Sequence, residues 1–311
     1  MLIWTLIKKW LRKLFCKEEN KEEDDMLSNA IMGAGGTGVP ELTFEGGRYN
    51  AAKSADLDGR SMKSWSMTAD GTKGYSHDGD NRVTQFNFST PFDMSTLTSS
   101  YTYSKGDSVS NTFKRLRGFS MNAGGDHAMA IGVKDGTPEP NMYTVSNGNL
   151  LGMVNMNTGP DPSSVDNHAG YLGSCYLASD GSFYIIGSGQ NTTNGIGQLL
   201  RVDMPNPYNR QTSVLRSITT AFPEMDSQVR DITFSPDGLM MALVGWPSVA
   251  NYGKVYRYEL TTPYDPTTAT LVEPYVFPEI GNRYTKGIEF RADMRGFMVL
   301  YGNDTVGVYD L

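Results

Sequence analysis

The sequence predicts an all-β chain folded as a five-bladed β-propeller. An apolar strand, a tight turn and a second apolar strand recur five times along the 311 residues. Each repeat has room for two further strands, and four strands make one propeller blade. The fifth repeat stops early at Leu311, which leaves a place for a strand from the other end of the chain.

The repeat is defined by its turns, most of which carry Asp-Gly. Glycine adopts the positive φ that tight hairpins need without strain. The turns fall at residues 70, 124, 180, 237 and 293. The strands before them span 64–67, 118–121, 174–177, 231–234 and 287–290. Blades therefore start near residues 62, 116, 172, 229 and 285, and an open β-solenoid or a β-sandwich is the alternative fold.

The outer strands alternate apolar and polar residues, as partly exposed strands do. Third strands are expected at 83–88, 142–145, 199–202, 255–260 and 306–309, and fourth strands at 100–103, 150–156, 213–218 and 271–276. The fifth blade lacks its fourth strand. We predict that residues 41–45 supply it by pairing with residues 306–310, which would protect both open edges of the ring.

Two blades share a longer motif after the third strand. Blade one reads Ser89-Thr90-Pro91-Phe92-Asp93, and blade four reads Thr261-Thr262-Pro263-Tyr264-Asp265. Blade three keeps only a trace at 203–208, and blades two and five lack the motif. The motif resembles a propeller repeat found in many bacteriophage structural and tail-associated proteins and in some bacterial surface proteins. Residues 26–36 also resemble the opening of phage virion proteins. The resemblance implies a propeller in a virion or surface setting and no catalytic residues.

Residues 1–17 predict a cationic amphipathic helix. Its apolar face carries Ile3, Trp4, Ile7, Trp10 and Leu14, and five Lys or Arg side chains lie opposite. Such a helix suits an anionic membrane surface or a groove on another protein. Residues 18–40 predict a linker, first acidic and then glycine-rich, before the propeller of residues 41–311. The alternative is that Met26 is the true start.

Few residues suggest chemistry. The formal net charge of −7 argues against nucleic-acid binding. Cys16, Cys175 and the three histidines form no metal pattern, so neither metal nor cofactor is expected. Four of five equivalent positions near the channel are basic: Lys63, Arg117, Arg230 and Lys286, with Gly173 as the fifth. This ring could bind an anion at the channel mouth, or the cations could pair with neighbouring carboxylates.

These features predict a non-enzymatic phage structural protein, tail- or spike-associated, in which the propeller serves adhesion or assembly. The expected partners are other virion proteins or a host-surface receptor, with an anionic membrane as a further possibility for residues 1–17. One alternative is a propeller hydrolase, lactonase-like or glycan-acting. Another is a bacterial surface-binding module tethered to the membrane by residues 1–17.

Overall fold

The computed structural model describes residues 48–57, 62–79, 82–103, 115–134, 137–146, 149–157, 171–189, 198–218, 222, 229–245, 254–277, 284–302 and 304–310. The chain divides into two units, 1–46 and 47–311, and all the described residues belong to the second. The predicted helix at 1–17, the linker at 18–40 and the strand at 41–45 lie outside the described residues.

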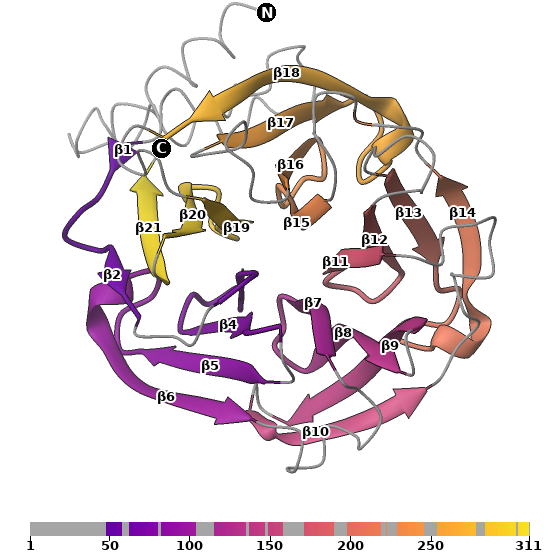
Figure 1. Ribbon diagram of the computed structural model, residues 1–311, viewed down its shortest axis with the longest axis horizontal. Coiled ribbons are helices and arrows are strands. Elements are labelled where there is room, and N and C mark those ends of the chain that lie inside the picture. Colours follow the sequence, from indigo (N-terminus) through magenta and orange to yellow (C-terminus); the bar gives the residue numbers. More distant parts are fainter. Residues whose placement is uncertain are drawn as a thin grey trace, which may run out of the picture. The chain divides into compact units, whose positions relative to one another are not determined.

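Residues 47–311 form a five-bladed β-propeller, as the repeat predicts (Figure 1). Blade one contains β3 (Ser66–Met67), β4 (Lys73–His77), β5 (Val83–Phe88) and β6 (Leu97–Tyr103). Blade two contains β7 (Arg115–Met121), β8 (His127–Lys134), β9 (Thr137–Ser146) and β10 (Asn149–Asn157). Blade three contains β11 (Tyr171–Leu177), β12 (Phe183–Gly189), β13 (Gln198–Asp203) and β14 (Val214–Ile218). Blade four contains β15 (Val229–Phe234), β16 (Met240–Gly245), β17 (Lys254–Leu260) and β18 (Ala269–Val276).

Blade five is built from both ends of the propeller sequence. Its strands β19 (Thr285–Phe290), β20 (Gly296–Tyr301) and β21 (Thr305–Asp310) are followed in the sheet by β1 (Arg48–Tyr49), and β2 (Ala55–Asp56) pairs with β21 as well. Closure by the N-terminal side is therefore confirmed, but with other residues than predicted. Arg48 and Tyr49 face Asp310 and Tyr309, while Ala55 and Asp56 face Val306 and Thr305. These pairs occupy the edge of β21 that had been assigned to residues 41–45.

The innermost strand of each blade lies beside those of its two neighbours. Contacts run from β3 to β7, β7 to β11, β11 to β15, β15 to β19 and β19 back to β3, which completes the ring. The apolar core lies between the blades. Between blades four and five, for example, the Phe277 ring packs against Phe297 and Tyr309, with centroids 5.8 and 4.9 Å away. Blade-to-blade packing therefore provides most of the apolar burial that holds the ring together.

Three blades share a structural motif in the loop between their third and fourth strands, which we call the aromatic staple. Phe92, Tyr208 and Tyr264 each have φ between 56 and 59°. Each backbone N–H donates to the hairpin glycine carbonyl of its own blade, at 2.9, 3.0 and 2.8 Å respectively. The following Asp or Asn caps one turn of 3-10 helix, and these turns are η2 (Met94–Thr96), η4 (Arg210–Thr212) and η6 (Pro266–Thr268).

Each staple ring covers the hairpin glycine of its own blade. A Cβ added to Gly71, Gly181 or Gly238 would lie 2.7, 2.6 or 2.4 Å from the ring. Those glycines also have φ near 70°. Glycine is therefore required twice, for its backbone conformation and for the space it leaves. Blade three, whose sequence keeps only a trace of the motif, also forms the staple, through Tyr208.

The same rings reach the preceding blade. Arg291 of blade five lies over Phe92, 4.6 Å from the ring centroid. Tyr208 of blade three stacks on His127 of blade two with centroids 3.7 Å apart. Tyr264 of blade four lies 5.4 Å from Phe183 of blade three. The staple thus binds a hairpin within its own blade and joins two blades, at about 0.5–1.5 kcal/mol per aromatic pair beyond burial.

Candidate functional site in the central channel

The predicted basic positions occupy β-bulges of the innermost strands. The pairing register shifts across Arg117 in β7, Gly173 in β11, Arg230 in β15 and Lys286 in β19. A bulge adds one residue outside the ladder and changes the direction of its side chain. Lys63 precedes β3, and its backbone N–H donates to the His77 carbonyl at 2.9 Å. The equivalence seen in the sequence therefore has a structural cause.

The four cations have different surroundings. The Lys286 ammonium lies 2.9 Å from the Asp304 carboxylate in an ion pair shielded from solvent. Lys63 and Arg230, from blades one and four, both lie close enough to His77 to oppose its protonation. Burial is the larger cause, and together these effects lower the pKa of His77 to about 3. The pairing alternative thus holds for Lys286, while an anion at Lys63, Arg117 and Arg230 stays a prediction.

At the next residue of each innermost strand, the backbones of neighbouring blades approach one another closely. The residues at this level are Ser64, Gly118, Ser174, Asp231 and Gly287. A Cβ on Gly118 would lie 3.0 Å from the Ser174 backbone, and one on Gly287 would lie 2.8 Å from the Trp65 nitrogen. Small residues are therefore needed here because neighbouring backbones nearly touch.

Asp231 is the one charged residue at this level. Its Oδ2 accepts hydrogen bonds from Ile288 N at 3.0 Å and Trp65 N at 3.4 Å, which joins blades four, five and one. Burial raises the pKa of Asp231 to about 8, although these bonds and the Arg230 cation act in the opposite direction. From the sequence, Asp231 was expected only as the first residue of the strand at 231–234, and its role was missed. Its charge among serines and glycines was the available signal.

A second level lies two residues further along, at Ser66, Ser120, Tyr176, Thr233 and Glu289. The Ser66 hydroxyl accepts a bond from Met121 N at 3.2 Å, and the Ser120 hydroxyl accepts one from Leu177 N at 3.1 Å. Both bonds cross to the next blade. In blade five the equivalent position carries a carboxyl group, and the Thr233 hydroxyl donates to Glu289 Oε2 at 3.3 Å.

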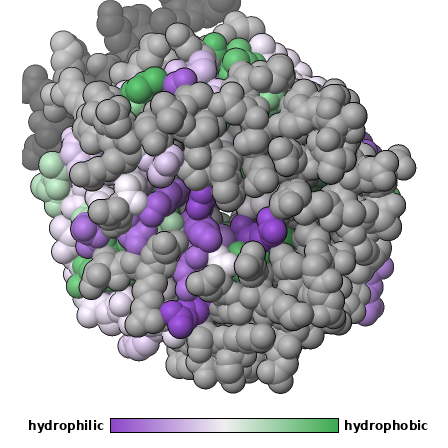
Figure 2. Space-filling model, in the orientation of Figure 1, coloured by the Kyte–Doolittle hydropathy of each residue, from purple (hydrophilic) through white to green (hydrophobic). Residues whose placement is uncertain are grey.

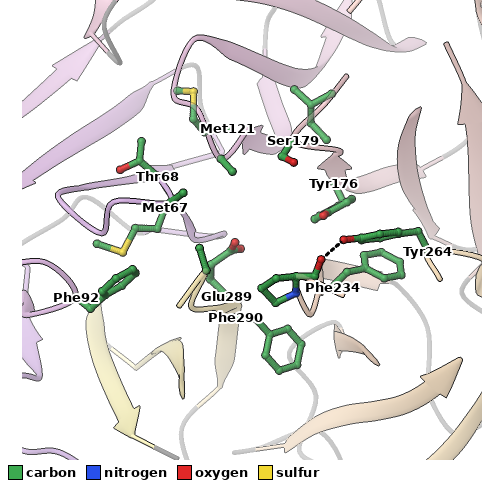
Figure 3. Close-up of a pocket in the computed structure, with 15 residues that line it drawn as sticks. Met67, Thr68, Phe92, Met121, Tyr176, Ser179, Phe234, Tyr264, Glu289 and Phe290 are labelled. Carbon is green, nitrogen blue, oxygen red and sulfur yellow. Dashed lines mark hydrogen bonds between the residues drawn. The ribbon is translucent and has the colours of Figure 1, made fainter. Parts of the chain in front are cut away.

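Glu289 points into a cavity of about 120 Å³ on the hairpin side of this level (Figure 3). Met67, Met121, Phe234 and Phe290 form apolar walls, and all five blades contribute to the lining. Burial raises the pKa of Glu289 well above its usual range, and the nearby Asp231 carboxyl raises it further. Sequence reasoning missed this site.

The cavity opens toward the hairpin face through a rim of small residues. The rim residues occupy equivalent positions one residue before each turn centre: Ala69, Ala123, Ser179, Pro236 and Ala292. Most of them are exposed, whereas the strand residues beneath them are mostly buried. Viewed down the ring, hydrophilic residues gather around the central hollow (Figure 2). The channel thus combines polar levels along its strands with a cavity of mixed polar and apolar lining at one end.

Other predicted residues contribute little to a site within the described ranges. Cys175 is buried and free, and Cys16 and His168 lie outside the described residues. Over the described residues, no three His, Cys, Asp or Glu side chains are grouped closely enough to hold a metal ion. No helix in the same part of the chain is long and apolar enough to span a bilayer. The anchor residues Ile3, Trp4, Ile7, Trp10 and Leu14 also lie outside it.

Comparisons with known proteins identify no family for this chain. The sequence matches no family model, and no curated protein matches it. Similar solved structures include the β-propeller domain of Cps50 (Swd1) from Myceliophteria thermophila. That similarity has a TM-score of 0.41 at 11% sequence identity and covers 77% of this chain and 67% of that one.

Proposed function

We propose that this chain is a non-enzymatic structural protein of a bacteriophage virion, associated with the tail or a spike, whose propeller serves adhesion or assembly. The observation that carries the proposal is the place of the phage-like motif in the fold. Residues 89–93 and 261–265, which resemble the phage repeat, form the aromatic staples of blades one and four. The resemblance therefore rests on residues that brace neighbouring blades.

Such bracing suits a mechanical role. In blades one, three and four the staple joins the hairpin to the preceding blade, and β1 and β2 close the ring on β21. Pairing with β1 and β2 covers the edge of β21, so the last blade is joined to the segment that precedes the first. In this proposal the hairpin face or the opposite face contacts virion proteins or a host receptor, and residues 1–17 dock on an anionic membrane or another protein.

Mass spectrometry of purified virions tests the proposal directly. The chain is expected in particles purified by density gradient, at a constant ratio to the major capsid protein over successive gradients. An abundant host cytoplasmic protein serves as the contamination control and should fall with each gradient. A chain that falls in parallel with that control would overturn the proposal. Phages lacking the chain would then separate the two roles, because an adhesion protein lowers the adsorption rate and an assembly protein lowers particle yield.

The two carboxyl groups near the channel axis, Asp231 and Glu289, favour a second candidate, a propeller hydrolase. Asp231 has a pKa of about 8, and the pKa of Glu289 is also raised. A carboxyl group that stays protonated near neutral pH can act as a general acid. Hydrolysis of a panel of lactones, esters and glycosides, compared between the wild type and Glu289→Gln, separates the candidates. Turnover that depends on Glu289 would favour the hydrolase, and equal background rates would favour the structural role.

A further inference from the structure

We propose that the axial cavity on the hairpin face binds a primary ammonium group carried on an unbranched apolar chain, such as a lysine side chain of a partner protein or a small alkylamine. The inference goes beyond the proposed function, because it concerns a binding property of the purified chain. The binding experiment below and the mass spectrometry of virions can therefore give opposite results, and either proposal can fail while the other stands.

The first argument is the isolation of the Glu289 carboxyl. Within the described part of the chain Glu289 forms no ion pair, and its one hydrogen bond is the long one from Thr233. Other carboxylates of the propeller are paired with cations, such as Asp304 with Lys286 at 2.9 Å and Asp310 with Arg291 at 2.6 Å. Glu289 is half-buried, and a carboxyl group partly removed from water without a cation gains from a ligand that supplies one.

The second argument is the chemistry of the walls. Met67, Met121 and Phe234 form apolar walls, the side chains of Thr68, Tyr176 and Ser179 add hydroxyl groups, and Glu289 is the one carboxyl group of the lining. Calcium and magnesium sites in proteins use carboxylate ligands, and no three His, Cys, Asp or Glu side chains are grouped among the described residues, so this lining suits neither ion. The negative charge of the ionised Glu289 carboxylate repels an anion and attracts a cation. A methylene chain ending in a charged nitrogen matches both the apolar walls and the carboxyl.

The third argument is size and access. A cavity of about 150 Å³ in another protein holds benzene, with six carbon atoms. At about 120 Å³ this cavity fits a chain of four carbons and one nitrogen, which is the end of a lysine side chain. The rim residues Ala69, Ala123 and Ala292 are small, so a chain can enter along the axis from the hairpin face. Arginine is longer and ends in a planar group, and fits this volume less well.

Binding should therefore depend on pH in a defined direction. Burial raises the pKa of Glu289, and so does the Asp231 carboxyl, whose own pKa is raised to about 8. The Tyr176 hydroxyl also faces Glu289, but its pKa is raised well above its usual range, so it stays protonated. An ammonium ligand binds the ionised carboxylate, so the proton leaves when the ligand enters. Affinity for an alkylammonium should rise as pH rises toward the raised pKa, as long as the amine itself stays protonated.

The test uses the whole chain labelled with carbon-13 at its methionine methyl groups, with n-butylammonium as the probe. Met67 and Met121 report from the cavity wall, and their signals are assigned from Met67→Leu and Met121→Leu. A ligand of five heavy atoms should bind in the millimolar range. We expect saturable shifts of these two signals, at least a tenfold loss of affinity in Glu289→Gln, and a similar loss for n-butanol, which has the same shape without charge.

Two further variants keep the result interpretable. Glu259→Gln removes an exposed carboxylate from β17 and should leave binding unchanged. Ser179→Phe fills the rim while keeping Glu289, and should abolish the shifts. Unchanged signals from the other methionines show that each variant is folded. Equal affinity for the wild type and Glu289→Gln, or no saturable shift in the millimolar range, would overturn the proposal.

Peptides distinguish the two sources of the ammonium group. An acetylated tripeptide with a central lysine should bind more tightly than n-butylammonium if the natural ligand is a protein side chain, and the same peptide with norleucine should not bind. A free amine that binds while the lysine peptide does not would assign the cavity to small amines. Either peptide result is consistent with an ammonium-binding site. Equal affinity of the wild type and Glu289→Gln for n-butylammonium would reject the site.

Discussion

Blades one and five solve the same packing problem in different ways. Blade one places the Phe92 ring of its staple over its hairpin glycine. Among the described residues, no aromatic ring covers the turn of blade five. Its turn carries Met294 with φ of 58° at the place where Gly71 stands in blade one. Where no ring needs the space, a side chain is tolerated at some cost in backbone strain.

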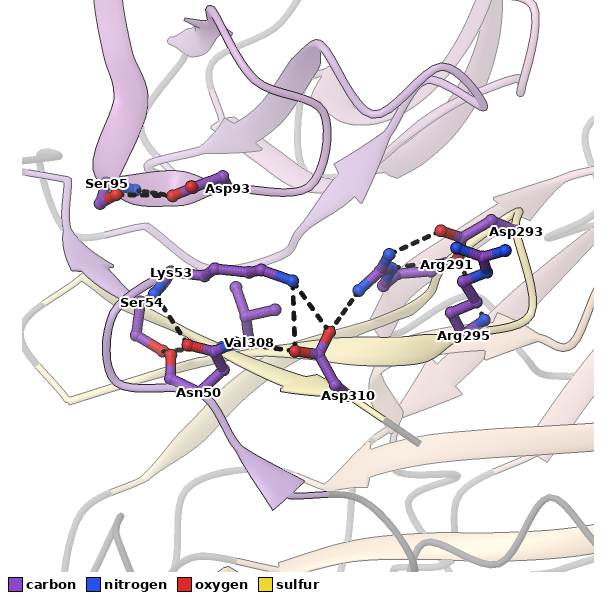
Figure 4. Close-up of polar contacts among 10 residues, drawn as sticks. All are labelled: Asn50, Lys53, Ser54, Asp93, Ser95, Arg291, Asp293, Arg295, Val308 and Asp310. Carbon is purple, nitrogen blue, oxygen red and sulfur yellow. Dashed lines mark hydrogen bonds and ion pairs between the residues drawn. The ribbon is translucent and has the colours of Figure 1, made fainter. Parts of the chain in front are cut away.

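Polar contacts take the place of the staple in blade five (Figure 4). Asp310 Oδ1 lies 2.6 Å from Arg291 Nη1, and its Oδ2 lies 3.2 Å from Lys53 Nζ. Asn50 Nδ2 donates to the same carboxylate at 2.8 Å. Lys53 and Asn50 belong to the closing segment between β1 and β2. In blades one, three and four an aromatic ring covers the hairpin glycine, whereas the closing segment is held in blade five by short strands, charged contacts to Asp310 and the ring pair of Tyr49 and Tyr309 at 5.4 Å.

Removing the closing segment should have the largest effect. A chain that begins at residue 47 keeps β1 and β2 and should unfold within a few degrees of the full chain. A chain that begins at residue 58 loses both strands and the Lys53 and Asn50 contacts, and it opens the edge of β21. Its Tm should fall by about 10 °C or more, since each kcal/mol lost lowers Tm by roughly 2–4 °C in a large domain. Calorimetry checks this, and equal Tm values for the two chains would show that closure contributes nothing.

Tyr264→Ala should have the next largest effect. Tyr264 packs against rings of blades three and four, and its hydroxyl donates to the Pro236 carbonyl. Truncation should lower the free energy of unfolding by about 3 kcal/mol, as for other aromatic residues in a packed site. Tyr101→Ala, on the exposed face of β6, is the matched control and should change little. Urea unfolding of both variants measures the difference.

Asp231 should make stability fall as pH rises. Its folded pKa of about 8 lies above the ordinary value of 3.8, so the folded state holds a proton that the unfolded state has lost. The stabilisation is present below about pH 4 and disappears as pH rises through 8. Glu289 acts in the same direction. His77 acts oppositely, with a folded pKa of about 3 against 6.5, but only below pH 6.5.

Between about pH 6.5 and 8, Asp231 and Glu289 therefore affect stability without an opposing contribution from His77. There the free energy of unfolding should fall by about 1 kcal/mol per pH unit for each proton involved. Asp231→Asn should reduce this slope, whereas Glu259→Gln should retain it. Urea titrations at four pH values measure the slopes. A wild-type stability that rises over this window would contradict the buried, protonated carboxyl.

Gly125→Ala should have the smallest effect. Gly125 has φ of 72°, like the other hairpin glycines, so alanine strains its backbone by about 1 kcal/mol. Blade two connects its third and fourth strands through Ser146-Asn147-Gly148-Asn149 and carries no staple residue there. A loss well above 2 kcal/mol in urea unfolding would mean that this glycine also leaves space for a neighbour.

The repeat could be predicted from the sequence because each blade forms its hairpin and its strands from a similar local sequence pattern. Turn glycines and strand periodicity are local signals, and the predicted strands agree with the observed ones in all five blades. The closing segment could not be predicted in the same way. Its strands are two residues each, at Arg48–Tyr49 and Ala55–Asp56, and two residues show no periodicity.

The staple of blade three and the axial site were missed for related reasons. Asn206-Pro207-Tyr208-Asn209 lacks the Ser and Thr residues of the motif, yet it keeps an aromatic ring at positive φ and a capping side chain. The staple is formed by those two residues, Tyr208 with its ring and Asn209 with its capping side chain. Asp231 and Glu289 stand in strands that alternate like any other. Only the ring closure brings their carboxyls to the axis, and no local pattern records that convergence.

The Tyr264 ring leaves no space for a side chain at the hairpin glycine Gly238. A double-mutant cycle on Gly238 and Tyr264 measures this effect. Gly238→Ala in the wild type should cost the backbone strain and the collision with a ring 2.4 Å away. In the Tyr264→Ala background it should cost only the strain, about 1 kcal/mol. We predict an interaction energy above 1 kcal/mol from urea unfolding of the four proteins. Additive effects within about 0.5 kcal/mol would contradict the account.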